Sequence, residues 1–460
     1  MISRRPAGMA VFAILFGVLA LSGSIARAAD DERPEVALDR PLTADECVRL
    51  ALDRNYRIRQ ASDLKSIEDA NKLAAWGGLV PSLQLGYDFQ HVSSTTPNPQ
   101  NLVKSTYEAD NKGFSVGASQ TLLSLPVIYN IIAAGRNSGA ATEDVRNAEQ
   151  TAAQIVRQQY YNVIESIKLE EVAREDVRLA DEELKRTQSL FDVGSVARTD
   201  VLKSNVRVSE SQSSHTAAVN RIDIEMARLN QALALPPNSK IQLVESLEPR
   251  AANPDSAAAY AMALEQRPDV KAAHLRLSAA EADKKAALGG KVPYISHSYR
   301  WSDSNSDGSS TFPNPNDPNE TVTQDFSNEG QDWSYQIGAT WNILDRLVTE
   351  SNIQRAKYNK LLQEHQMLDL ENAVMVETTE ALVALRNAQA QILVAREARA
   401  SAEEDLKLSQ ERYSVGLGTI LELIDAQVNV SRARTGEVTA MAALKRAEAQ
   451  LDKAIGQQNW

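Results

Sequence analysis

The amino-acid sequence contains an internal duplication. Residues 76–89 (WGGLVPSLQLGYDF) and 288–301 (LGGKVPYISHSYRW) share a Gly-Gly pair, a proline and aromatic positions at an offset of 212 residues. Residues 190–194 (LFDVG) and 412–416 (RYSVG) form a second matching pair at an offset of 222. A chain duplicated on this scale builds one object from two similar halves.

The first 28 residues have the pattern of a secretory signal peptide, with two arginines, an apolar run and an Ala-Arg-Ala cleavage pattern. We therefore expect a signal peptide at 1–28, a first structural repeat at 29–250 and a second at 251–460. A net charge of -12 argues against nucleic acid as a partner. The single cysteine, Cys47, excludes an internal disulfide and is expected to be a small buried residue.

Four segments, each about ten residues long, alternate between apolar and polar side chains with a period of two, which predicts β-strands. They lie at about 81–91, 112–122, 292–302 and 332–344. One face of each segment is apolar and rich in aromatic residues, and the other is small and polar. This pattern is typical of strands that cross a bilayer with lipid on one side and water on the other. Alternation alone also fits an ordinary half-buried antiparallel sheet.

The polar residues 92–111 and 303–331 between the strands of each pair are expected to form long external loops. Four strands cannot close a barrel, because known single-chain barrels begin at about eight strands. An open sheet in lipid would leave unpaired backbone groups at both edges. If the strands span a membrane, the chain must oligomerise, and the pattern alone does not choose among two, three and four copies.

Two stretches, at about 124–190 and 345–411, contain no proline except Pro126 near the start of the first, and they predict exceptionally long helices. At 1.5 Å per residue, about 65 residues make a rod of roughly 100 Å, which cannot bury itself in a compact domain. Apolar residues recur at seven-residue spacing, as in coiled coils. These helices fit either a soluble antiparallel coiled coil or a helical tube that continues a barrel. Only the strands favour the tube.

Both long helices end at the second matching pair, which predicts helical tips at about 191–199 and 412–419. In each tip a glycine is expected to end one helix, and a threonine (Thr199 or Thr419) to cap the next.

In its duplication, its Pro-led strands and its two aromatic-x-Val-Gly tips, the mature chain resembles the TolC family of outer-membrane efflux proteins. The most specific segment is 413–426, YSVGLGTILELIDA. The resemblance implies a mainly α fold with membrane β-structure. Three chains, each with four strands, would form one 12-stranded β-barrel continued by a long periplasmic α-helical barrel.

The resemblance also implies a function and partners. The homotrimer would be a passive exit duct in the outer membrane of a Gram-negative bacterium, serving a tripartite efflux or type I secretion system. It would contact outer-membrane lipid, dock to a periplasmic adaptor (membrane fusion) protein and, through the adaptor, reach an inner-membrane pump.

Family members close at their tips, and acidic residues one turn past the last tip glycine form a ring at the pore entrance. Glu422 and Asp425 match those positions and, three residues apart on a helix, share one face. A ring of carboxylates favours cations. Asp200 and Tyr413 match positions that bind neighbouring coils together at the closed tip. A basic residue often expected near Gly418 is absent, so one closing contact is in doubt.

The resemblance places the adaptor contact at the tips themselves, on Val193, Gly194, Val415 and Gly416. The sequence has no phosphate-binding Gly-Lys-Ser/Thr loop and no catalytic constellation, and its five histidines form no metal-ligand pair. We therefore expect no enzyme activity, cofactor or metal.

The alternatives are a trimeric surface adhesin and a periplasmic coiled-coil structural protein. An adhesin would gather its strands at the C-terminus, whereas here they are split between the halves.

Overall fold

The computed structural model describes residues 40–97, 104–244, 246–247, 255–314 and 316–457. The predicted signal peptide, 1–28, lies outside these residues. The chain separates into a small unit, Met1–Pro41 with Lys240–Gln242, and a large unit, Leu42–Ser239 with Leu243–Trp460. The helices and strands described below all belong to the large unit.

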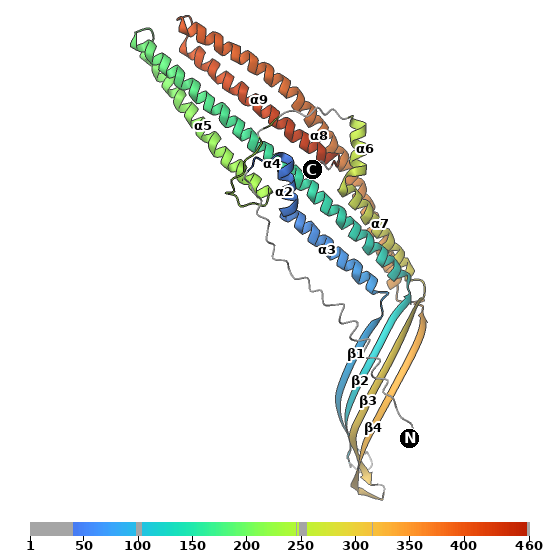
Figure 1. The fold of residues 1–460 in the computed structure, drawn as a ribbon. Helices are drawn as coiled ribbons and strands as arrows, with labels where there is room; N and C mark the ends of the chain where they lie inside the picture. The colour runs from blue at the N-terminus through green and yellow to red at the C-terminus, as the bar shows by residue number, and fades with distance from the viewer. Residues whose placement is uncertain (1–39, 98–103, 245, 248–254, 315, 458–460) are drawn as a thin grey trace. The chain divides into compact units, whose positions relative to one another are not determined.

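The two halves of the chain contain the same order of elements (Figure 1). The first half runs α2 (Ala44–Arg54), α3 (Tyr56–Gly77), β1 (Ser82–Pro97), β2 (Lys104–Leu123), α4 (Leu125–Asp192) and α5 (Arg198–Ala232). The second half runs α6 (Ser256–Gln266), α7 (Pro268–Gly289), β3 (Tyr294–Asn314), β4 (Asp317–Thr340), α8 (Val348–Ser414) and α9 (Ile420–Ala454). The repeated sequence therefore corresponds to a repeated order of helices and strands.

The four strands form one antiparallel sheet in the order β1-β2-β3-β4. Its register aligns apolar side chains across all four strands, for example Leu85, Val116, Trp301 and Trp333. We call the side of the sheet that carries this row the aromatic face. Trp333, Phe89 and Leu85 on this face are 72%, 60% and 48% exposed, so the described residues leave much of the face uncovered. Both edges of the sheet, β1 and β4, lack a neighbouring strand among the described residues.

The strands are longer than the sequence predicted, and the expectation of long polar loops is wrong. Strand β1 continues to Pro97 and β2 begins at Lys104, while β3 continues to Asn314 and β4 begins at Asp317. Of the segments expected as loops, 98–103 and residue 315 lie outside the described residues. Strand pairing is made by backbone hydrogen bonds, so it continues where the side chains become polar.

Two helices exceed 65 residues, and neither packs along a single partner. Helix α4, with 68 residues, packs against α3, α7, α5 and α9 in turn. Helix α8, with 67 residues, packs against α7, α6 and α9. At about 1.5 Å per residue each helix is on the order of 100 Å long, so shorter helices are needed along its length to bury it. In the described part of the chain, no helix is both long and apolar enough for a membrane span.

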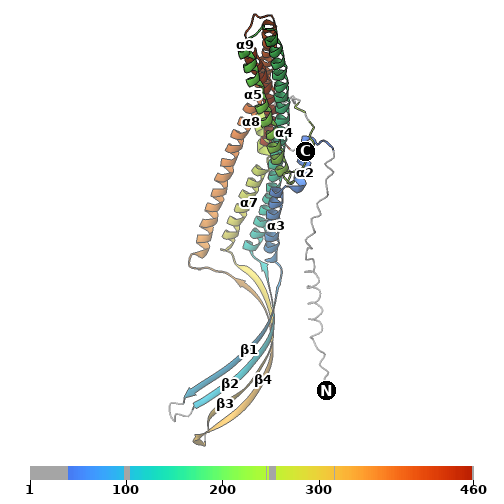
Figure 2. The same cartoon turned by 90° about the vertical axis from the view of Figure 1, so that its left-hand side faces the viewer.

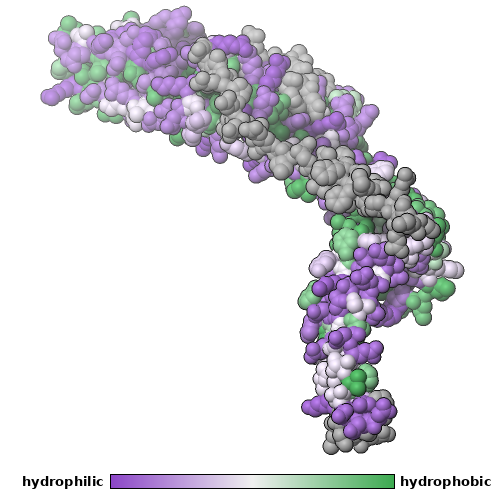
Figure 3. Space-filling view, turned by 60° about the horizontal axis from the view of Figure 1, so that its bottom comes forward, coloured by the Kyte–Doolittle hydropathy of each residue, from purple (hydrophilic) through white to green (hydrophobic). Residues whose placement is uncertain are grey.

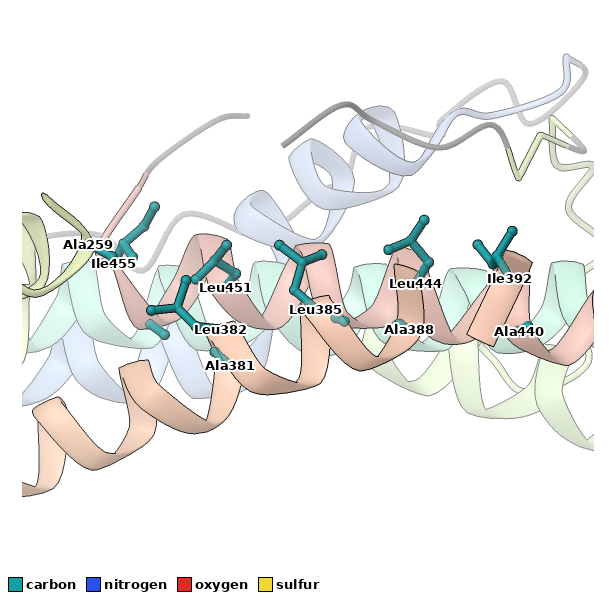
Figure 4. Packing of buried hydrophobic residues seen from close by; sticks show 12 residues of the cluster. Ala259, Ala381, Leu382, Leu385, Ala388, Ile392, Ala440, Leu444, Leu451 and Ile455 are labelled. Atoms are coloured by element: carbon teal, nitrogen blue, oxygen red, sulfur yellow. The ribbon is translucent and has the colours of Figure 1, made fainter. Parts of the chain in front are cut away.

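An extended apolar core lies between α8 and α9 and is joined by Ala259 of α6 (Figure 4). It includes Leu382, Leu385, Ile392, Leu444 and Leu451, each less than 6% exposed, with alanines between them. Alanine lets the two helices approach closely. Most other helical surface is hydrophilic on the side that Figure 3 shows, and hydrophobic residues gather near the junction of the sheet and the helices.

Candidate pore entrance at the helical tips

Two turns connect the long helices to their returning partners, and both turn on a glycine. Gly194 has φ of 75° and Gly416 has φ of 76°, in the left-handed region that favours glycine. In the first turn the Ser195 N–H donates to the Leu190 carbonyl at 2.8 Å. In the second, the Leu417 N–H donates to the Arg412 carbonyl at 2.9 Å. These matching bonds end α4 and α8 in the same way.

The two returning helices begin differently. Thr419 precedes α9, and its hydroxyl accepts a hydrogen bond from the Glu422 N–H at 3.2 Å. Helix α5 begins instead after Ala197, which makes no side-chain cap bond. The expectation that Thr199 caps α5 is therefore wrong, because the helix starts one residue before it. The second tip has the more firmly defined helix start.

Tyr413 joins the two tips in one apolar cluster. Its side chain is 5% exposed and packs with Leu406, Ile420 and Leu423 of the second hairpin. Partly buried Leu190 and Val196 of the first hairpin pack against the same cluster. The structure therefore brings the two hairpins together around Tyr413.

The polar end of Tyr413 lies among acidic groups. The Tyr413 hydroxyl is buried and has no hydrogen-bond partner of adequate geometry in the described part of the chain. Burial raises the pKa of Tyr413, and the negative charges of Asp200 and Glu183 raise it further, while Thr187 opposes this rise. Asp200 and Tyr413, which the resemblance paired by function, thus lie near each other within one chain.

Glu422 and Asp425 lie on the first turns of α9, and both are exposed. The Glu422 Oε2 is 3.7 Å from the Arg412 Nη2, and the same guanidinium donates to the Leu417 carbonyl at 3.4 Å. Both side chains of this ion pair are more than half exposed, so it contributes at most about 1 kcal/mol. Sequence reasoning missed Arg412, although this residue begins the repeated motif.

Gly418 leaves little room for a side chain. A Cβ at this position would lie 3.2 Å from the Tyr413 nitrogen and 3.3 Å from the Arg412 Cβ. The chain therefore passes close over the end of α8 there. The guanidinium of Arg412 reaches this turn, where it donates to the Leu417 carbonyl.

Each tip exposes apolar side chains. Val193 is 74% exposed and Val415 is 68% exposed. Leu417, which sequence reasoning did not select, is 74% exposed beside them. Exposed apolar groups gathered at the end of two helical hairpins mark a surface suited to contact with another protein.

The described residues contain no group of three or more His, Cys, Asp and Glu side chains that could hold a metal ion.

The sequence matches the family model described as "Outer membrane efflux protein" over residues 48–235 and 259–457, which covers most of both halves. This chain belongs to the outer membrane efflux protein family. The matched ranges include both tips and all four strands. It is a family of channels.

Relatives and solved structures agree with this assignment. The outer membrane protein TolC of Salmonella enteritidis is 21% identical over 429 residues, covering 92% of this chain and 81% of that protein. The outer membrane efflux protein BepC of Brucella suis is 25% identical over 310 residues, and this match covers 65% of this chain and 61% of BepC. The crystal structure of VceC from Vibrio cholerae has a TM-score of 0.73 at 13% identity, covering 90% of this chain and 96% of that chain. The mainly α fold with four strands per chain is thus confirmed as TolC-like.

Proposed function

We propose that this protein is a homotrimeric, passive exit duct in the bacterial outer membrane. It would be the outer-membrane component of a tripartite efflux or type I secretion system. Three four-stranded sheets would join into one 12-stranded barrel, and the long helices would form a periplasmic tube. The protein would transfer no energy and catalyse no reaction, since a pump in the inner membrane would drive transport.

The observation that carries this proposal is the four-stranded sheet with an uncovered aromatic face and two open edges. Unpaired backbone groups cost several kcal/mol each in lipid, so β1 and β4 require partners. Pairing of β4 with β1 of the next chain satisfies both edges with identical contacts, as closed cyclic symmetry requires. Family membership favours three copies over two or four.

The tips support the second part of the proposal, a selective entrance. Glu422 and Asp425 are exposed on the first turns of α9, so three chains would gather six carboxylates at the narrow end of the tube. Such a ring favours cations. Asp200 and Tyr413 would hold this entrance closed by keeping the two hairpins of each chain together.

The exposed Val193 and Val415, each beside its turn glycine (Gly194 and Gly416), form the proposed contact with the adaptor protein. Helical hairpins of an adaptor could cover these side chains, and the adaptor would link the duct to the inner-membrane pump.

Ion selectivity in planar bilayers tests the entrance. The purified protein should conduct in discrete steps and prefer K⁺ to Cl⁻. The double variant Glu422→Gln, Asp425→Asn should lower that preference severalfold. A matched pair on exposed positions of α5, Glu210→Gln with Asp223→Asn, removes the same charge away from the α9 tip and should leave the preference unchanged. If both double variants changed the preference for K⁺ equally, the placement of Glu422 and Asp425 at the pore entrance would be contradicted.

A further inference from the structure

The connections between the strands and the long helices differ between the two halves of the chain. In the first half β2 and α4 are separated by Ser124 alone. In the second half β4 ends at Thr340 and α8 begins at Val348, so residues 341–347 (WNILDRL) lie between them. We call these residues the linker. Figure 2 shows the linker as an open arc between β4 and α8, which departs from the internal symmetry of the chain.

The apolar side chains of the linker have little cover among the described residues. Trp341 is 59% exposed, Ile343 is 79% exposed, Leu344 is 87% exposed and Leu347 is 70% exposed. Leaving such side chains in water costs about 25 cal/mol per Å² of apolar surface. Exposed apolar groups gathered in one place mark a contact with lipid or with another protein.

The backbone of the linker forms a strained turn. Arg346 has φ of 58° and Leu347 has φ of 65°, in the left-handed region that costs a residue other than glycine about 1–2 kcal/mol. Asp345 Oδ2 accepts hydrogen bonds from the Thr349 N–H at 2.8 Å and from the Thr349 hydroxyl at 2.5 Å. The turn is therefore fixed to the first turn of α8 by Asp345 rather than by burial of its own apolar side chains.

The apolar stretches on the aromatic face shift from strand to strand and reach the linker. On β1 the stretch runs from Leu83 to Phe89, and on β4 it runs from Trp333 to Ile343. Through the pairing of β2 and β3, Leu83 is aligned with Tyr335 and not with the end of the β4 stretch. The strands of a membrane barrel tilt by about 35–45°, so one membrane plane crosses successive strands at shifted residues. A plane that follows the aromatic face therefore passes through the linker.

The length of the β4 stretch supports the same placement. A tilted strand needs about 9–11 residues to cross the hydrocarbon, and residues 333–343 meet this requirement. Strand β4 itself ends at Thr340, so the linker lies at the boundary between hydrocarbon and headgroups. The helices form the tube on the periplasmic side of the proposed duct. The linker, which leads into α8, therefore lies beside the phospholipids of the periplasmic leaflet.

Polar groups flank the apolar side chains of the linker in the manner of a membrane interface. The Trp341 Nε1 donates to the Lys291 carbonyl at 3.0 Å, so the indole ring can lie in lipid with its polar group satisfied. The Lys291 Nζ lies 2.9 Å from the Glu350 Oε2, and Arg346 is exposed. Tryptophan is enriched where membrane meets water, and basic side chains extend toward the headgroups there. This arrangement fits a lipid surface better than a protein partner.

We propose that the linker is a membrane anchor whose apolar side chains insert among the phospholipids of the periplasmic leaflet, beside the sheet. The proposal rests on the membrane-spanning sheet proposed above. Insertion removes Trp341, Ile343, Leu344 and Leu347 from water and thereby offsets the strain of the left-handed turn. It also fixes the height at which α8 leaves the membrane, because Asp345 ties the linker to the first turn of that helix.

Fluorescence quenching in phospholipid vesicles that contain the full-length protein tests the anchor. The native thiol is removed by Cys47→Ala, and Leu344→Cys then carries a nitrobenzoxadiazole label. Phospholipids that carry a nitroxide quench a label in the leaflet, and iodide quenches a label in water. Ile337→Cys, at a position that is 62% exposed on the aromatic face, is the control for lipid, and Val193→Cys, at a position that is 74% exposed at a helical tip, is the control for water.

The label on Leu344→Cys should be quenched severalfold more strongly by nitroxide lipid than by iodide. A nitroxide near the headgroup should quench it more than one at the end of the acyl chain, because interfacial side chains lie about 5–10 Å deep. Leu347→Cys is a second reporter in the same linker and should give the same pattern. The label on Val193→Cys should show the opposite preference.

Quenching of the linker labels by iodide and not by lipid would overturn the anchor. Labels shielded from both quenchers would overturn it as well, because another protein surface would then cover the linker. In either case, quenching of Ile337→Cys by lipid would leave the membrane-spanning sheet intact. If nitroxide lipid failed to quench Ile337→Cys, the spanning sheet itself would be contradicted, and the anchor with it.

Discussion

Tyr413 provides the sharpest test of how the entrance is held closed. The ring is 5% exposed and contacts apolar side chains of both hairpins, whereas its hydroxyl has no hydrogen-bond partner of adequate geometry among the described residues. Truncating a buried aromatic residue to alanine costs about 3–5 kcal/mol. If about half of this comes from the contact between hairpins, Tyr413→Ala shifts the closed-to-open ratio by roughly 10- to 70-fold, since 1.4 kcal/mol corresponds to a factor of about ten.

Tyr413→Phe keeps the ring and removes only the unpartnered hydroxyl. The closed-to-open ratio should then remain within about a factor of five, because burial of an unsatisfied hydroxyl costs free energy rather than contributing it. Tyr358→Ala, at a position that is 62% exposed on α8, is the control for loss of a tyrosine from the same helix.

Single-channel recording measures the ratio directly as the open fraction. The open fraction of Tyr413→Ala should be far above that of the parent protein. The open fractions of Tyr413→Phe and Tyr358→Ala should be close to that of the parent. An open fraction for Tyr413→Phe as high as for Tyr413→Ala would refute the reasoning, because the hydroxyl and not the packed ring would then hold the tip.

Three further predictions concern stability, measured as the thermal midpoint of the detergent-solubilised protein. Gly416→Ala should destabilise the protein by about 1–2 kcal/mol, because the backbone at this position has a φ of 76°. Gly436→Ala in the interior of α9 should instead stabilise it by about 0.5–1 kcal/mol. Equal effects of the two substitutions would contradict a left-handed turn at Gly416. Asp176→Ala should cost about 3–5 kcal/mol because it leaves the Arg207 guanidinium, 2.7 Å from Asp176 Oδ1, buried without its partner, and the joint change Asp176→Leu, Arg207→Met should recover most of the loss. Burial raises the pKa of Glu183 in the folded protein above its ordinary value of 4.5 in the unfolded chain. Ionisation of Glu183 therefore lowers the free energy of unfolding at pH values above 4.5. Glu183→Gln should raise the thermal midpoint near neutral pH and give no gain below pH 4.5. A gain that persists in acid would contradict that assignment.

The sequence predicted the parts of the fold that follow from periodicity. The period-two alternation of residues such as Leu85 and Trp333 correctly located one face of the sheet, and the absence of proline beyond Pro126, in the first turn of α4, located the long helices. The outer parts of the strands were missed because they carry Ser, Asn and Asp, which are typical of loops. Backbone pairing does not depend on those side chains, and the apolar residues there, such as Phe326, lie on the opposite face.

The tip glycines could be predicted because a left-handed turn requires them. The role of Arg412 could not, because its guanidinium reaches Glu422 only after the turn folds back. The start of α5 was misplaced because no side chain caps it, so the local sequence carries no signal at Ala197. Contacts made across a turn or between hairpins depend on tertiary geometry that a linear pattern does not contain.

The central claim is that three chains complete one barrel by joining the open edges of their sheets. The detergent-corrected mass of the purified mature protein, determined by sedimentation, tests it most directly. The account predicts a single species containing three chains. A mass of one, two or four chains would contradict it, because the two open edges would then be satisfied in another way or not at all.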